Sequence, residues 1–137
     1  MNIGRIPAKT ARLDPAREAL IDVPNNRRIT YGDLDQRIRR LANGLCSTLE
    51  LQRGARVAIL SRNCIEYMEI FYACARIGLI AQPLNWRLGT EELARIIEDG
   101  EPSAIVCSGE YIDVGTELKG RINIPQWLYF GEGSDDS

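Results

Sequence analysis

The stretch 56–88 alternates short and long apolar runs, and this pattern constrains the fold of the chain more than any other feature. The runs 56–60 and 79–88 do not alternate between apolar and polar residues, as a strand with one solvent-exposed face would. Continuous apolar runs of this kind are typical of parallel strands covered on both sides. The intervening run 64–77 is apolar on most sides, which predicts a buried helix, and Gly78 follows it as a tight turn. We therefore expect a strand–helix–strand unit.

The first 30 residues are expected to contain a short helix and a hairpin. Residues 1–7 are expected to form a loosely held arm, and a short helix is expected within 8–17, with Asp14 and the following proline as its start signal. Two short strand-like runs flank the turn residues Pro-Asn-Asn at 24–26, a pattern that predicts a β-hairpin over 19–30.

A long amphipathic helix is predicted to start directly after the hairpin. Thr30 and Asp33 stand at the spacing of a capping box, with aspartate in place of the preferred glutamate. Apolar residues then recur at steps of three and four as far as Leu49, which gives the helix one apolar stripe. Gly44 lies within it at a cost of up to ~1 kcal/mol relative to alanine, and a close contact with another helix would explain it.

Further caps place the helices downstream. Asn63 is predicted to cap the helix of the central unit, with Glu66 at the reciprocal position, and Gly78 to end that helix. Thr90 is predicted to cap another helix, which Gly100 closes. The remaining predicted elements are strands at 104–107 and 127–130 and a short helix at 111–119. Helices and strands alternate after the hairpin, which predicts a layered α/β fold with a mainly parallel sheet and flanking helices.

Composition and charge limit the classes of function. Hydrophobic residues make up 45% of the 137-residue chain and charged residues 26%, which is ordinary for one small globular domain. The net charge of −2 gives no indication of a nucleic-acid or anionic-membrane partner, and the arginine pairs 27–28 and 39–40 are expected to be solvated. The sequence has no histidine, which excludes Ser-His-Asp and Cys-His sites within the chain.

The cysteines are expected to be reduced core residues. Cys46, Cys64, Cys74 and Cys107 form no Cys-x-x-Cys pair, and three of them fall in apolar helix or strand contexts. This favours buried thiols over metal ligands and fits a reducing compartment. No signal peptide is visible, and no run approaches the ~20 apolar residues of a membrane span, so a cytoplasmic location is expected.

Ligands of open parallel sheets bind beyond the carboxyl ends of the strands. These ends are predicted at 61–63, 85–87 and 108–110, and none has the glycine spacing of a phosphate-binding loop. Arg62 and Asn63 would suit an anion at a helix N-terminus. A plain cap beside a solvated arginine is the commoner arrangement.

Two other pairs of residues have both a functional and a structural interpretation. Trp86 and Arg87 would suit stacking on a ligand or clamping it, although tryptophan more commonly covers the edge of a core. Glu66 and Glu69 lie three residues apart on one helix, where a cap and a surface charge are commoner than an acid/base pair. The residues alone therefore predict an α/β domain without a catalytic, cofactor-binding or metal-binding set.

Three segments of the chain, read in order, match motifs of a known family. Segment 29–34, Ile-Thr-Tyr-Gly-Asp-Leu, is similar to a Leu-Thr-Tyr-x-Glu-Leu motif. Segment 54–66 resembles a Gly-Asp-Arg-Val-Ala strand followed by Asn-x-x-Glu, and 75–85 resembles Lys-x-Gly-Ala-x-x-x-Pro-Leu-Asp/Asn. All are motifs of the N-terminal part of the adenylate-forming ligase superfamily. The continuation 86–93, Trp-Arg-Leu-Gly-Thr-Glu-Glu-Leu, looks most like fatty-acyl-CoA synthetases.

The resemblance implies a ligase scaffold and no ligase site. Family members use ATP, Mg and CoA. They bind and use these groups through four motifs: a Ser/Thr/Gly-rich loop that ends in Pro-Lys-Gly, a Tyr-Gly-x-Thr-Glu segment, a Thr-Gly-Asp segment and a C-terminal catalytic lysine. The 137 residues contain no counterpart of these motifs. No catalytic residue therefore carries over, and we expect this chain to bind none of the three cofactors.

The resulting hypothesis is an N-terminal fragment of an AMP-forming acyl-CoA synthetase that is itself inactive. Its expected organisation is an N-terminal arm over 1–18, a partial AMP-binding domain over 19–130 and a disordered tail over 131–137. The alternative is a non-catalytic binding or assembly module, or half of a split ligase, with the remainder of the ligase or a second copy as partner. A gene fragment without a role of its own is a third hypothesis.

Overall fold

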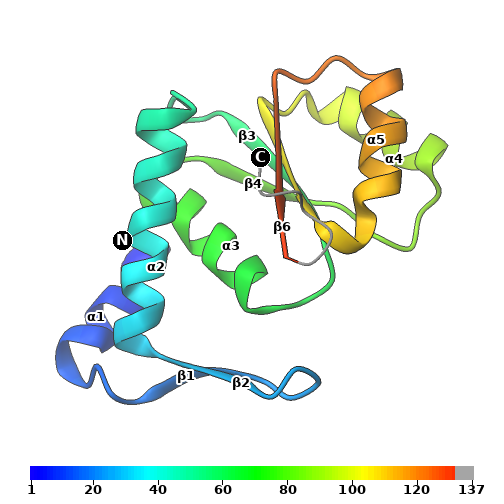
Figure 1. The fold of residues 1–137 in the computed structure, drawn as a ribbon. Coiled ribbons are helices and arrows are strands. Elements are labelled where there is room, and N and C mark those ends of the chain that lie inside the picture. Colours follow the sequence, from blue (N-terminus) through cyan, green and yellow to red (C-terminus); the bar gives the residue numbers. More distant parts are fainter. Residues whose placement is uncertain (132–137) are drawn as a thin grey trace. The chain divides into compact units, whose positions relative to one another are not determined.

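The structure is a computed structural model that describes residues 1–131, so the tail expected over 131–137 lies outside them apart from its first residue. Figure 1 labels the helices and strands. The chain divides into two compact units. Unit 1 comprises residues 1–53 and 63–79, and unit 2 comprises 54–62 and the chain from residue 80 onward.

Unit 1 is built on two helices, α2 (Tyr31–Asn43) and α3 (Ile65–Ile77), which pack against each other. Thr30 accepts a hydrogen bond from the backbone N–H of Asp33 at 3.2 Å, which confirms the hydroxyl cap predicted for α2. The apolar stripe predicted for α2 is buried at Leu34, Ile38 and Ala42. Burial of this stripe is the main reason why the helix is stable in this position.

The predicted hairpin precedes α2. Its strands are β1 (Glu18–Asp22) and β2 (Arg27–Thr30), which pair antiparallel with Ile21 opposite Arg28. Asn26 takes a left-handed conformation in the turn, with φ 49°, which asparagine tolerates better than most residues. The turn residues recognised in the sequence therefore do form the connection.

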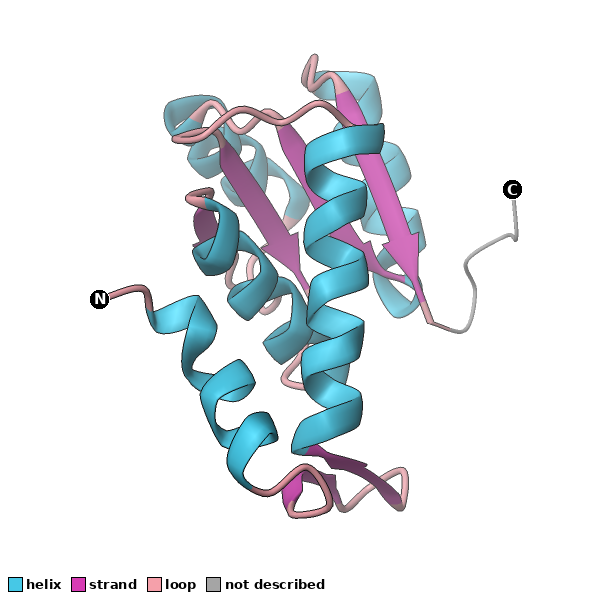
Figure 2. Ribbon diagram, turned by 90° about the vertical axis from the view of Figure 1, so that its left-hand side faces the viewer, coloured by secondary structure: helices cyan, strands magenta, loops and turns pink. Residues whose placement is uncertain are grey.

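The first residues are held firmly, unlike the expected loose arm. A 3-10 turn, η1 (Ile3–Arg5), leads into α1 (Ile6–Leu13); η1 packs on α3, and α1 lies along α2 (Figure 2). Gly4 is buried against the backbone of Arg76, whose Nε donates a hydrogen bond to the Gly4 carbonyl at 3.0 Å. The side-chain amide of Asn2 also donates to the Arg76 carbonyl at 3.1 Å. A glycine at the contact point is what allows this close approach.

Helix α1 lies earlier in the chain than predicted. Pro7 stands in its first turn, where the missing N–H of proline costs nothing. Asp14 is the residue at its C-terminal end, and its backbone N–H donates to the carbonyl of Thr10 at 2.9 Å. The prediction that Asp14 and the following proline start a helix is therefore wrong, because Pro7 fills the starting position.

Helix α2 does not continue unchanged to Leu49. A π-helical turn, η2 (Gly44–Thr48), follows its last residue. A side chain at Gly44 would meet nothing within 4 Å, so the predicted close helix contact is absent. Gly44 instead marks the change from α- to π-helical hydrogen bonding, which is rare in proteins.

Helix α3 begins later than its predicted cap. Cys64, with an extended backbone, is the residue before the helix and makes no side-chain capping bond. Asn63 is exposed, and Glu66 forms an ion pair with Arg27 at 2.7 Å, so the cap predicted for Asn63 and Glu66 is wrong. Gly78 ends the helix with φ 78°, as predicted from its place after the apolar run.

Unit 2 contains the predicted parallel sheet. Its strands lie in the order β4 (Ile80–Pro83), β3 (Arg56–Leu60), β5 (Ala104–Ser108) and β6 (Gln126–Phe130), and every pair of neighbours is parallel. The strand expected over 79–88 is confined to β4. Residues 57–60 of β3 are at most 1% exposed, which confirms that both faces of this strand are covered.

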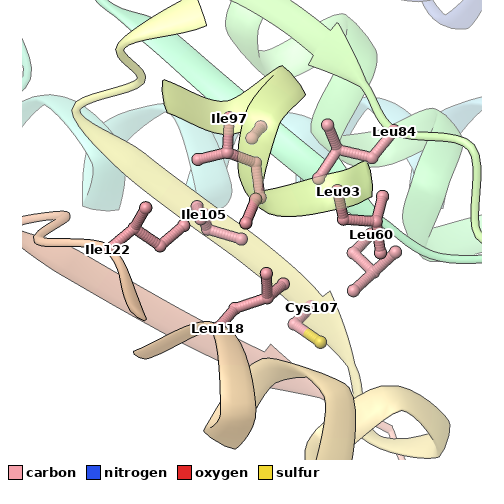
Figure 3. Close-up of a cluster of buried hydrophobic side chains, with 10 residues drawn as sticks. Leu60, Leu84, Leu93, Ile97, Ile105, Cys107, Leu118 and Ile122 are labelled. Atoms are coloured by element: carbon pink, nitrogen blue, oxygen red, sulfur yellow. The ribbon is translucent and has the colours of Figure 1, made fainter. Parts of the chain in front are cut away.

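Two helices, α4 (Thr90–Gly100) and α5 (Ile112–Arg121), pack over one face of the sheet. Alternate residues of β3 and β5 point into this layer, and apolar residues of both helices meet them (Figure 3). The labelled members of this core are Leu60, Leu84, Leu93, Ile97, Ile105, Cys107, Leu118 and Ile122. A short 3-10 turn, η3 (Gly109–Tyr111), joins β5 to α5.

The start of α4 differs by one residue from its prediction. Gly89 is the N-cap residue, and Glu92 accepts a hydrogen bond from the Gly89 backbone N–H at 3.1 Å. The hydroxyl of Thr90 donates instead to Glu117 of α5 at 3.1 Å. Thr90 therefore links two helices and does not cap one.

The end of α4 also differs. Gly100 is its last helical residue, and Glu101 takes the left-handed conformation, with φ 47°. A Cβ on Gly100 would collide with the side chain of Gln82 from β4. Gly100 therefore packs against the end of the Gln82 side chain and does not form the predicted left-handed cap.

Candidate functional site

The carboxyl ends of β3, β4 and β5 lie at one edge of the unit 2 sheet, because these strands are parallel neighbours. The segments that follow them supply five side chains that contact one another. We call them the arginine–tryptophan cluster: Arg62, Trp86, Arg87, Glu110 and Tyr111. All five belong to unit 2.

Trp86 is the centre of the cluster. The guanidinium carbons of Arg62 and Arg87 lie 4.6 Å and 4.5 Å from the centroid of its ring. The ring of Tyr111 lies 6.4 Å away, tilted by 36°. Each arginine is within the distance of a cation–π interaction, which contributes about 0.5–1 kcal/mol at an exposed site.

Arg62 is oriented by two further groups. Its Nε donates a hydrogen bond to the hydroxyl of Tyr111 at 3.2 Å and lies 3.7 Å from a carboxylate oxygen of Glu110. The hydrogen bond to Tyr111 is the main cause that raises the pKa of Arg62, with a smaller contribution from the charge of Glu110. Arg62 is therefore a permanent cation in a defined position.

The chemistry of the cluster suits binding and not bond-making. Two cations and a flat ring can contact a ligand that carries anionic groups and an aromatic system. The only acidic member, Glu110, already faces Arg62, and the cluster contains no thiol. We find no nucleophile beside a base in this arrangement.

Sequence reasoning paired Trp86 with Arg87 as possible ligand contacts but did not join Arg62 to them. The expected structural role of Trp86 is confirmed, since its ring packs on the edge of the unit 2 core. Arg62 is exposed but not merely solvated, because it contacts Trp86 and Tyr111. Sequence reasoning did not name Tyr111 as a member of the cluster. Its position directly after the predicted strand end at 108–110 could have indicated it.

Glu66 and Glu69 do not form an acid/base pair. Glu66 pairs with Arg27, and Glu69 lies 2.5 Å from the Nε of Arg37. The second carboxylate oxygen of Glu69 accepts from Arg37 at 3.3 Å, whereas the first lies outside hydrogen-bond geometry. Both glutamates therefore tie α3 to neighbouring elements of unit 1.

The two carboxylates differ in their electrostatic surroundings. Burial acts to raise the pKa of Glu66, but the hydrogen bond and charge of Arg27 outweigh it and hold the pKa below its usual value. Burial dominates for Glu69 and raises its pKa, although Arg37 opposes the shift. The carboxylate of Glu69 is thus buried and incompletely compensated by Arg37, whereas the less buried carboxylate of Glu66 is well compensated by Arg27.

The cysteines match their predicted role in part. Cys74 and Cys107 are buried, and burial raises the pKa of each thiol to about 12. Cys64 is half-buried, but Cys46 is exposed, which differs from a uniform set of core thiols. Across residues 1–131, no three Cys, Asp or Glu side chains are grouped to hold a metal ion.

Within the described part of the chain, no helix has the length and apolar character needed to cross a membrane. Helix α2, one of the two 13-residue helices of unit 1, carries a polar face with several arginines.

Comparison with known proteins identifies the family. The family described as AMP-binding enzyme matches residues 8–129. A feruloyl-CoA synthase from Amycolatopsis is 34% identical over 116 residues, which cover 85% of this chain and 23% of that protein. The long-chain-fatty-acid–CoA ligase FadD13 of Mycobacterium tuberculosis is 30% identical over 134 residues, which cover 98% of this chain and 26% of the ligase.

Solved structures of similar proteins have the same fold. A long-chain-fatty-acid CoA ligase from Rhodopseudomonas palustris has a TM-score of 0.88 and 34% identity, covering 98% of this chain and 34% of that one. The N-terminal domain of FACL13 from M. tuberculosis has a TM-score of 0.87 and 26% identity, with 94% and 33% covered. The chain spans about a quarter of the length of the curated relatives it matches. It belongs to the AMP-binding enzyme family and corresponds to the N-terminal part of adenylate-forming ligases.

Proposed function

We propose that this chain is the N-terminal portion of an AMP-forming acyl-CoA synthetase. The enzyme would join a carboxylic acid to AMP, release pyrophosphate, and then transfer the acyl group to CoA. The observation that carries the proposal is the family match over residues 8–129, supported by relatives named as CoA ligases for fatty and aromatic acids. None of the four cysteines, all of which lie among the described residues, forms a disulfide, and this favours a cytoplasmic setting.

In this proposal the chain supplies a scaffold and no catalytic group. Unit 2 provides a parallel sheet with a packed core, but the phosphate-binding and catalytic motifs of the family do not occur in the 137 residues. We expect the purified chain to bind no ATP or Mg and to release no pyrophosphate.

The coding sequence immediately downstream tests the identity of the enzyme. We expect a Ser/Thr/Gly-rich loop ending in Pro-Lys-Gly, in the same frame or in an adjacent one. A downstream sequence without this loop, or with an unrelated domain, would contradict the proposal and favour a separate binding or assembly module. Such a module would use a second copy or another chain as its partner, and a clean monomer in light scattering would argue against it.

The arginine–tryptophan cluster supports a second, more limited role in binding. Two arginines on one indole ring suit a phosphorylated aromatic ligand, so this role departs from the expectation that the chain binds no cofactor. We propose that the cluster contacts CoA, which combines phosphates with a flat adenine base. ATP carries the same kinds of group, but the ATP-binding motifs of the family do not occur in the 137 residues.

Fluorescence of Trp86 tests this second role. The chain has two tryptophans, so Trp127→Phe leaves Trp86 as the only indole. We expect CoA to change the emission saturably in this variant, and Arg62→Ala or Arg87→Ala to weaken binding by about tenfold each. Arg95→Ala, an exposed arginine on α4, is the matched control. No saturable change, or equal binding by all variants, would contradict the role.

A further inference from the structure

The outward face of the N-terminal helix has a composition that neither the fold nor the proposed ligase scaffold requires. Pro7 is buried against unit 1, whereas the opposite side of α1 is open to solvent (Figure 2). We call this side the N-terminal face. It comprises Ile3 and Arg5 of η1 together with Ile6, Lys9, Arg12 and Leu13 of α1, all of which are exposed.

Large aliphatic side chains on this face are unusually exposed. Leu13 is 80% exposed, and Ile3 and Ile6 are each 48% exposed. Ile6 and Leu13 stand seven residues apart and therefore lie on one side of the helix. An open groove of about 530 Å³, lined mainly by apolar surface, runs along the face and includes both of them. Aliphatic groups gathered in this way favour contact with another apolar phase.

The same face is strongly basic. Arg5, Lys9 and Arg12 recur at steps of four and three, so they form a second stripe beside the aliphatic one. Among the residues that the structure describes, none of the three has an acidic partner within salt-bridge distance. The net charge of −2 hides this local excess, since Asp14 is the only acidic residue in the first 17.

Most arginines elsewhere in the molecule are compensated. Ion pairs join arginines to carboxylates in both units, at distances between 2.5 and 3.7 Å. The N-terminal face therefore stands out because it combines uncompensated cations with exposed aliphatic groups on one short helix. A second copy is a poor occupant, because two such faces would bring like charges together.

We propose that the N-terminal face binds the surface of a membrane that contains anionic lipids. Arg5, Lys9 and Arg12 would contact the headgroups, while Ile6 and Leu13 would enter the boundary of the acyl layer. Long cationic side chains reach outward from such a position, which lets both stripes of one helix act together. The contact is peripheral and independent of the proposed ligase reaction.

Sedimentation with lipid vesicles tests the proposal on the whole chain. We expect the protein to sediment with vesicles of phosphatidylcholine mixed with phosphatidylglycerol, and not with phosphatidylcholine alone. The loss of two cations should weaken this binding about 30-fold, so Lys9→Glu/Arg12→Glu should abolish it. Ile6→Ser/Leu13→Ser should also reduce it, because binding requires the aliphatic groups as well.

Matched variants separate this contact from general charge effects. Arg95→Glu/Arg121→Glu changes the net charge equally on exposed helices of unit 2 and should bind like the unaltered protein. Circular dichroism shows whether each variant is folded, and Lys9→Arg/Arg12→Lys should bind normally. Absent binding by the unaltered protein, or equal loss in the unit 2 variant, would overturn the proposal. A dimer that Ile6→Ser/Leu13→Ser abolishes, without vesicle binding, would assign the face to a second copy and overturn it too.

Discussion

Gly4 shows how one absent side chain holds a terminal segment in place. A Cβ at this position would overlap the backbone of Arg76, which cannot move without disturbing α3. The contact also brings the Gly4 carbonyl to the Arg76 guanidinium, which pairs with the buried Asp35 at 2.8 Å. One glycine therefore connects the first turn of the chain to the interior of unit 1.

We predict that Gly4→Ala destabilises the protein by about 1–3 kcal/mol, the usual cost of overpacking. Urea denaturation followed by circular dichroism measures the change. Gly44→Ala is the matched control, because an added Cβ there meets nothing within 4 Å and the backbone is helical. This control should be unchanged or up to ~1 kcal/mol more stable. Equal destabilisation by both substitutions would contradict the close-contact explanation.

At the scale of elements, two ion pairs connect α3 to β2 and α2, and they should respond oppositely to pH. The pKa of Glu66 is lowered in the folded protein, so its contribution to stability is present at neutral pH and lost as the pH falls through that lowered value. We predict that Glu66→Gln lowers the free energy of unfolding by about 1 kcal/mol or less at about pH 7. The difference should shrink in thermal unfolding as the pH falls below the ordinary carboxyl pKa, and vanish once Glu66 is protonated in the folded protein.

The pKa of Glu69 is raised, so the folded state holds its proton more tightly than the unfolded state does. The contribution of Glu69 to stability therefore falls as the pH rises from the ordinary carboxyl pKa through the raised value. We predict that Glu69→Gln gains stability relative to the unaltered protein over that interval. If Glu69→Gln instead loses stability as the pH rises, burial does not dominate at this site.

The strands and most helices could be predicted because each follows from a local pattern. Continuous apolar runs gave β3 and β5, and turn residues gave the hairpin. Caps were less predictable, since Asn63, Thr90 and Gly100 each have the right residue type for a cap but are used otherwise. Thr90 bonds to Glu117 and Gly100 accommodates Gln82, and both partners are set by tertiary packing.

The candidate site was predictable only in parts. Strand ends are the expected place for a ligand, and Arg62, Trp86 and Arg87 stand at two of them. Their meeting on one indole ring depends on strand order, which places β3 between β4 and β5. Strand order is a long-range property, so the sequence pattern alone could not join these residues.

At the scale of the whole molecule, the chain matches only the N-terminal part of its relatives. It has two compact units with cores of their own, yet it spans about a quarter of the length of the relatives it matches. Among the described residues, the N-terminal face and the arginine–tryptophan cluster are the two surfaces that we propose for contact. In the proposed function the cores of both units supply support, and the chemistry is expected from other segments of the enzyme.

Acid- and CoA-dependent release of pyrophosphate tests the central claim most directly. We compare the purified chain with a chimera in which residues 1–131 replace the aligned quarter of the long-chain-fatty-acid–CoA ligase FadD13 of M. tuberculosis. The account predicts release by the chimera, because the chain supplies an equivalent scaffold, and none by the chain alone. Release by the chain alone, or a folded chimera that binds ATP without releasing pyrophosphate, would contradict it.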